Sequence, residues 1–161
     1  MSLSLYFLRH GQAGNRADWR GADAQRPLTV EGERGMERAA AAIAKLGLGL
    51  ELIISSPLVR AHQTAEIVST ALGAPTRLIT DTRLAPGFGP TQLARIVGEH
   101  RQAKSLMLVG HEPDFSETIG QVTGGGRIVV KKGALACVRI DDPASRQGTL
   151  VWLIPPKVLR R

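Results

Sequence analysis

The segment LSLYFLRHGQ (residues 3–12) changes abruptly from an apolar run to charged and polar residues. A short apolar run that is bounded in this way is typical of a buried strand. Two later segments repeat the change, namely IISSP (residues 53–57) and LVGHEP (residues 108–113). All three predict strands that end in side chains able to bind a ligand.

Segments whose apolar residues recur at helical spacing follow several of these apolar runs. Thr29 is a suitable N-cap for a helix that ends near Gly47, and a second helix starts at Leu58 and stops at Gly73 and Pro75. A third helix is expected over 91–100, and a fourth runs to 122 with Pro113 as its first residue. Strands are expected over 3–8, 50–54, 76–79, 106–109, 134–140 and 149–154. Strands that alternate with helices predict an α/β fold with a largely parallel sheet. The last two strands, joined by a turn at Asp141-Asp142-Pro143, are suited to an antiparallel edge.

Length and composition indicate one globular domain over residues 1–161. The single cysteine, Cys137, excludes an internal disulfide and lies in an apolar run, where a buried thiol acts as a small hydrophobe. No apolar stretch is long enough to span a bilayer, and the run that Arg9 interrupts is too short for a signal peptide. The expected compartment is therefore the cytoplasm, with no membrane partner.

The formal net charge of +7 favours anionic partners. Most of the arginines are scattered, and few aromatic residues are available to stack on bases, so no nucleic-acid partner is expected. The charge instead fits a phosphorylated substrate or an acidic protein surface.

The carboxyl ends of parallel strands lie along one edge of a sheet, where ligands bind. This topology is expected to bring together Arg9, His10, Arg60 and His111, which are far apart in the sequence. Guanidinium groups match the oxygens of a phosphate, and a neutral imidazole can attack phosphorus without a strong base. A second imidazole can stabilise the charge that develops on the phosphate oxygens. Gly11 would let the backbone approach the phosphate closely.

These joined motifs resemble the histidine phosphatase superfamily, whose fold is also called phosphoglycerate-mutase-like. The resemblance rests on Leu8-Arg9-His10-Gly11, Ser56-Pro57, Arg60-Ala61, Gln63-Thr64-Ala65 and Gly110-His111. Within the superfamily, the sequence resembles the small SixA-type branch of phosphohistidine phosphatases more closely. This resemblance rests on Asp23, Arg26-Pro27-Leu28-Thr29, Glu112-Pro113, Lys132-Gly133-Ala134, Trp152 and Pro156-Lys157. It covers nearly the whole chain and implies a minimal three-layer α/β/α architecture without a large lid.

The resemblance also implies the roles of the site residues. His10 would be phosphorylated in the intermediate, with Arg9, Arg60 and His111 completing the phosphate pocket and Asp23 as a further active-site residue. No metal and no cofactor are implied. The four histidines include no close ligand pair, and there is no cysteine cluster, so a zinc site is not expected.

One departure concerns the general acid. Many members of the superfamily place a glutamate after the third strand, where this sequence has Arg83. The candidates are then Asp23, Asp81 and Glu112, of which Asp23 is preferred. Weak acid catalysis would still permit attack on phosphohistidine, because imidazole is a much better leaving group than an alkoxide.

The substrate class follows from this departure and from the short connection between the third and fourth strands. That connection has no room for a large helical lid, so an open site suits phosphohistidine on a protein. A broad phosphomonoesterase for small phosphate esters is the alternative within the same chemistry. A non-catalytic phosphate-binding module on the same fold is the alternative outside it.

Overall fold

The computed structural model describes residues 2–73, 76–142 and 147–161. A central sheet has the strand order β3-β2-β4-β1-β5-β6. The strands are β1 (Leu3–Arg9), β2 (Leu52–Ser55), β3 (Arg77–Thr80), β4 (Ser105–Gly110), β5 (Leu135–Ile140) and β6 (Thr149–Ile154). Strands β1 to β4 are parallel to one another, whereas β5 is antiparallel to both β1 and β6. The predicted antiparallel edge is therefore confirmed.

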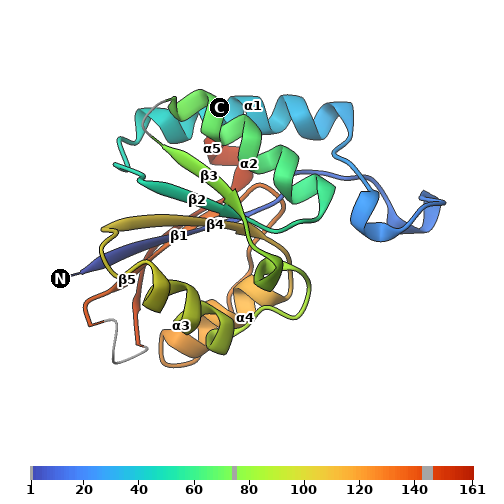
Figure 1. The fold of residues 1–161 in the computed structure, drawn as a ribbon. Helices are drawn as coiled ribbons and strands as arrows, with labels where there is room; N and C mark the ends of the chain where they lie inside the picture. Colours follow the sequence, from blue (N-terminus) through green and yellow to red (C-terminus); the bar gives the residue numbers. More distant parts are fainter. Residues whose placement is uncertain (1, 74–75, 143–146) are drawn as a thin grey trace.

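Helices cover both faces of this sheet, as Figure 1 shows. The helices α1, α2 and α5 lie on one face, and α3 and α4 lie on the other. Their bounds are α1 (Val30–Lys45), α2 (Val59–Leu72), α3 (Pro90–Glu99), α4 (Asp114–Val122) and α5 (Pro156–Leu159), with short 3-10 helices at Arg16–Asp18, Asp23–Gln25 and Thr82–Leu84. The three-layer α/β/α architecture with a mostly parallel sheet is confirmed, and Cys137 is buried as predicted.

Local chemistry explains where α1 begins. The Thr29 side chain accepts a hydrogen bond from the backbone N–H of Gly32, which is the cap that the sequence predicts. Gly32 is required for a different reason, since a Cβ there would lie 2.0 Å from the carbonyl oxygen of Gln12. The helix can therefore pack directly against the chain that leaves β1.

Some expectations differ from the structure. Pro113 is the residue before α4 and not its first helical residue, and β3 begins at Arg77 and not at Thr76. The short 3-10 helices and α5 were not predicted, because three or four residues are too few to show a hydrophobic period. Two predicted turn residues, Pro75 and Pro143, lie outside the described residues.

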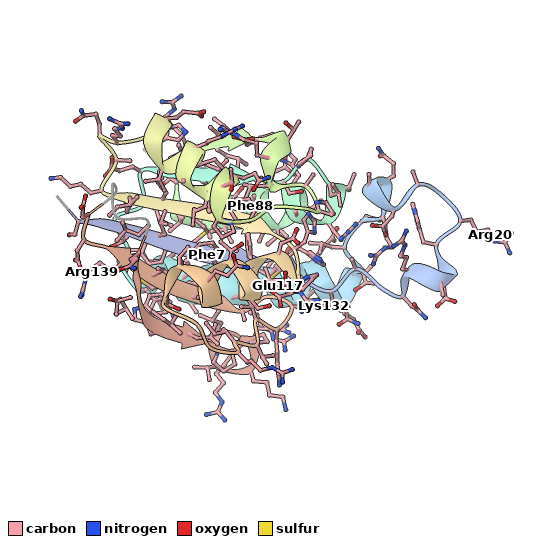
Figure 2. All side chains as sticks on the ribbon, turned by 90° about the horizontal axis from the view of Figure 1, so that it is seen from below. Phe7, Arg20, Phe88, Glu117, Lys132 and Arg139 are labelled. Atoms are coloured by element: carbon pink, nitrogen blue, oxygen red, sulfur yellow. The ribbon has the colours of Figure 1, made fainter. Side chains whose placement is uncertain are left out.

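Residues 14–25, which we call the arm, project from the body of the molecule between β1 and α1 (Figure 1). Residues 15–22 of this segment are exposed. Figure 2 shows Arg20 at its far end, well away from the labelled core residues Phe7 and Phe88. Among the helices that the structure describes, none has the length and apolar content needed to cross a bilayer.

A cluster of aromatic rings supports the end of β4. Phe115 of α4 packs edge-on against Phe7 and Phe88, with ring centroids 5.1 and 5.8 Å away. It also lies against Gly110, where a Cβ would come within 2.7 Å of the Phe115 ring. The ring therefore holds the residue that precedes His111.

Truncation of this ring tests its importance. We expect Phe115→Ala to lower the free energy of unfolding by about 3–5 kcal/mol, because it opens a cavity in a core that is fully buried. Urea denaturation followed by circular dichroism measures the effect. The exposed Val129→Ala is the control and should change stability by less than about 0.5 kcal/mol. Equal effects of the two substitutions would contradict this account of the core.

Candidate active site

The strand ends place the predicted residues at one edge of the sheet. Arg9 is the last residue of β1 and is paired in register with Gly110 of β4. The backbone N–H of His10 donates to the Gly110 carbonyl at 3.1 Å. The rings of His10 and His111 consequently lie with their centroids 5.2 Å apart. Arg60, in the first turn of α2, completes the group.

His10 is held in one tautomer. Its Nδ1 lies 2.7 Å from the Gly11 carbonyl oxygen, which can only accept, so Nδ1 carries the hydrogen. Burial lowers the pKa of His10 to about 3, with smaller contributions in the same direction from His111 and the neighbouring arginines. The ring is therefore neutral at neutral pH, and the Nε2 lone pair is available for attack on phosphorus.

His111 is fixed through its other nitrogen. Its Nε2 lies 2.7 Å from the hydroxyl of Ser56, the residue that follows β2. Burial first, and then the charge of Arg60, lowers the pKa of His111 to about 4, although Asp23 opposes the shift. When Ser56 donates its hydroxyl hydrogen to Nε2, Nδ1 of His111 becomes a donor.

Hydrogen bonds orient both guanidinium groups, and each group keeps a buried Nε donor without a partner. Arg9 donates from Nη1 to the Val130 carbonyl at 3.0 Å. Arg60 donates from Nη1 to the Asp23 carbonyl at 2.9 Å and from Nη2 to the Asp23 carboxylate at 3.0 Å. In the part of the chain that the structure describes, Nε of Arg9, Nε of Arg60 and Nδ1 of His111 are buried without a hydrogen-bond partner. A phosphate group, with its several acceptor oxygens, suits such donors.

These side chains line a cleft of about 1020 Å³. Cationic side chains outnumber carboxylates on its walls. The carboxylates are Asp23 and Glu112, and the cations are Arg9, Arg16, Arg26, Arg60, Lys131, Lys132 and Arg160. Burial, together with the charges of Arg9, Arg26 and Arg60, lowers the pKa of Lys132. The cleft is therefore suited to an anion.

Gly11 lines the cleft, but its backbone N–H is already in use. It donates to the Thr64 hydroxyl at 3.1 Å, and that hydroxyl donates to the Arg60 carbonyl at 2.8 Å. A Cβ at Gly11 would lie 2.6 Å from the Met36 side chain, so close packing explains the glycine. Direct contact between Gly11 and phosphate stays a prediction.

The surroundings of Asp23 argue against the predicted role as general acid. Its carboxylate pairs with Arg26 and Arg60, each at 3.0 Å. Burial alone would raise the pKa of Asp23, but the hydrogen bond from Arg26 and the charge of Arg60 outweigh it and lower the pKa. A carboxylate held in its ionised form orients Arg60 and is a poor proton donor.

The other two acid candidates differ in position. Asp81 binds Arg83 through both carboxylate oxygens, and hydrogen bonds from that side chain lower the pKa of Asp81. Arg83 also pairs with Glu99 of α3, and neither Asp81 nor Arg83 lines the cleft. Glu112 does line it, and its Oε1 accepts from the Ser116 backbone N–H at 2.9 Å. Glu112 is thus the acid candidate that the geometry favours.

A metal site was not expected from the sequence. Within residues 2–73, 76–142 and 147–161, no group of three or more histidine, cysteine, aspartate or glutamate side chains is placed to hold a metal ion. What the edge of the sheet does hold is a pair of neutral imidazoles among buried guanidinium groups.

The fold is that of a phosphoglycerate-mutase-like α/β protein, and its cation-lined cleft is suited to an anion. Residues 5–112 match the histidine phosphatase superfamily (branch 1), and the chain belongs to this family. Membership supports phosphatase activity. The sequence-based identification of the family is confirmed.

Individual relatives agree with this assignment. The chain is 37% identical to an uncharacterized protein of Picosynechococcus, over 98% of this chain and 99% of that protein. It is 26% identical to the phosphohistidine phosphatase SixA of Escherichia coli, over 96% and 94% of the two chains. A structure of the protein histidine phosphatase SixA complexed with tungstate has a TM-score of 0.85 and 23% identity, and covers 96% of this chain and 98% of that one. A Bacillus anthracis phosphoglycerate mutase has a TM-score of 0.77 at 14% identity, over 98% and 95% of the chains.

Three residues of the site had no role in the sequence analysis. Arg26 donates to Asp23 and to the carbonyls of Ala13 and Gly14, which ties the arm to the site. Ser56 holds His111, and Arg160 of the C-terminal segment reaches the cleft. The first two belong to the family motifs quoted above, whereas no pattern in the sequence pointed to Arg160.

The protonation state of His10 can be measured directly. We expect the ¹⁵N resonances of its ring to show the Nδ1–H tautomer and no titration from pH 8 down to pH 5, because burial lowers the pKa to about 3. His10→Ala assigns the signals, and the urea-unfolded chain should titrate near the ordinary value of about 6.5. A midpoint near that ordinary value in the folded protein would contradict the proposed neutral nucleophile.

Asp23→Asn distinguishes an acid from a positioning residue. We expect it to slow an aryl phosphate and an alkyl phosphate by the same factor, roughly ten- to a hundredfold, because a charged hydrogen bond to Arg60 is lost. Initial rates on p-nitrophenyl phosphate and glycerol phosphate give the comparison. Asp18→Asn, in the same arm, is the matched control and should leave both rates unchanged. A much greater loss on the alkyl ester would restore Asp23 as the acid.

Proposed function

We propose that this protein is a metal-independent phosphatase that forms a phosphohistidine intermediate at His10 and removes phosphate from histidine side chains of proteins. The observation that carries the proposal is the fixed tautomer of His10, which leaves Nε2 unprotonated beside the unused donors of Arg9 and Arg60. Because a side chain supplies the nucleophile and guanidinium groups supply the positive charge, the chemistry needs no metal-bound water.

The reaction proceeds in two displacements. The lone pair of His10 Nε2 forms a bond to phosphorus as the bond to the substrate imidazole breaks, and that imidazole leaves with the bonding electron pair and takes up a proton. Arg9, Arg60 and His111 stabilise the charge on the phosphate oxygens. Water then attacks the phosphorus of phosphorylated His10, the new phosphorus–nitrogen bond breaks with its electron pair returning to Nε2, and phosphate is released together with a proton from the water.

Leaving-group chemistry supports phosphohistidine as the substrate. Arg83 occupies the position where other superfamily members carry an acid, and it is bound to Asp81 and Glu99 away from the cleft. An imidazole can leave without a strong acid, whereas an alkoxide needs a proton in the transition state.

A broad phosphomonoesterase is the second candidate, because Glu112 lines the cleft and could protonate an alkoxide. The non-catalytic module has less support, since binding alone does not require a nucleophile with its lone pair exposed toward the phosphate site.

A side-by-side assay tests the proposal. We expect kcat/KM for a phosphohistidine protein to exceed that for a phosphoserine peptide by about 10² or more, the scale of general acid catalysis. Labelled substrate should give an acid-labile, alkali-stable phosphoenzyme that is absent in His10→Ala. His62→Ala, which removes a histidine outside the cleft, is the control. Equal rates on the two substrates would favour the broad phosphomonoesterase, and label retained in His10→Ala would exclude His10 as the nucleophile.

A further inference from the structure

The cleft extends well beyond the residues that would hold a phosphate. Its volume of about 1020 Å³ is that of a site for a drug-sized ligand. The outer walls carry Arg16, Lys131 and Arg160, all of them exposed, and we call these residues the basic collar. They come from the arm, from the loop before β5 and from the segment after α5. Three separate parts of the chain thus place cations around one opening.

The protein itself neutralises little of this charge. Arg16 approaches the Asp23 carboxylate only at 3.7 Å with its side chain 78% exposed, and Asp23 already binds Arg26 and Arg60. Lys131 has no ion pair among the described residues, and Arg160 donates from Nε to a backbone carbonyl, that of Pro156. Like charges gathered at an opening create a field that attracts anions.

The arm indicates that the anion is carried by a large molecule. It carries the exposed side chains of Trp19 and Arg20 beyond the body of the protein, and Figure 2 shows Arg20 at the tip and Lys132 on the side from which the arm projects. Tryptophan and arginine are the residues that most often anchor protein interfaces. A small phosphate ester inside the cleft would not reach this tip.

We propose that the basic collar and the arm form a docking surface for an acidic segment of the phosphoprotein substrate. The proposal rests on the proposed function and adds the charge of the partner. Acidic side chains around the phosphorylated residue would contact the collar as the phosphate enters the cleft. Charges at the rim of an interface act mainly on the association rate and are screened by salt.

Charge reversal of the collar tests this docking surface. The variant Arg16→Glu/Lys131→Glu is compared with Arg95→Glu/Arg101→Glu, which changes the net charge equally. Arg95 is exposed on α3, and Arg101 is exposed in the loop before β4, at the sheet edge opposite to the cleft. The substrates are two phosphohistidine peptides, one flanked by Asp and Glu and the other by Lys and Arg, together with p-nitrophenyl phosphate and a small bisphosphate ester.

We expect the wild type to prefer the acidic peptide and the collar variant to lose about tenfold or more of kcat/KM on that peptide relative to its kcat/KM on p-nitrophenyl phosphate. The control variant should behave as the wild type, and the preference should vanish near 1 M salt, where the screening length is about 3 Å. Equal rates on the two peptides, or an unaffected collar variant, would overturn the docking surface while leaving the phosphatase intact. A collar-dependent preference for the bisphosphate ester would overturn the protein partner, and wild-type inactivity on every substrate would instead remove the proposed function.

Discussion

The parallel pairing of β1 with β4 is the constraint on which the site depends. It places Arg9 opposite Gly110, so the histidines that follow the two strands lie side by side with ring centroids 5.2 Å apart. The pairing needs a glycine at the end of β4, because Phe115 occupies the space that a Cβ would take. The packing of Phe115 against Gly110 thus helps to set the distance between the rings of His10 and His111.

Burial then determines the protonation of those groups. Each imidazole would be partly charged in water at neutral pH, but desolvation lowers the pKa of His10 to about 3 and that of His111 to about 4. The neighbouring guanidinium groups oppose a further positive charge and act in the same direction. A cleft suited to an anion can therefore keep the proposed nucleophile neutral, since the positive charge resides on arginines that cannot release a proton.

Much of this arrangement is predictable from the sequence, and the rest is not, for physical reasons. Apolar runs that end in Arg9-His10, Ser55-Ser56 and Gly110-His111 already indicate which side chains share an edge. The arm carries no hydrophobic period, so its path and the contact of Asp23 with Arg60 depend on side-chain hydrogen bonds formed only in the fold. Arg160 reaches the cleft through a helix of four residues, which is too short to leave a pattern. The role of Asp23 is hard to predict from the sequence, because a carboxylate in an active-site motif does not reveal whether arginines already hold it.

The salt bridge between Asp23 and Arg60 links these features. The carboxylate accepts from Nη2 of Arg60 and the backbone carbonyl of Asp23 accepts from Nη1, so Asp23 holds both terminal nitrogens while Nε is buried without a partner. The same carboxylate accepts from Arg26, which also donates to the carbonyls of Ala13 and of Gly14, where the arm begins. One carboxylate therefore joins Arg60 in the cleft to the chain segment at the start of the arm. An aspartate held in this way is a poor proton donor, so the phosphatase that we propose either uses Glu112 for proton transfer or favours substrates whose leaving group departs with little assistance.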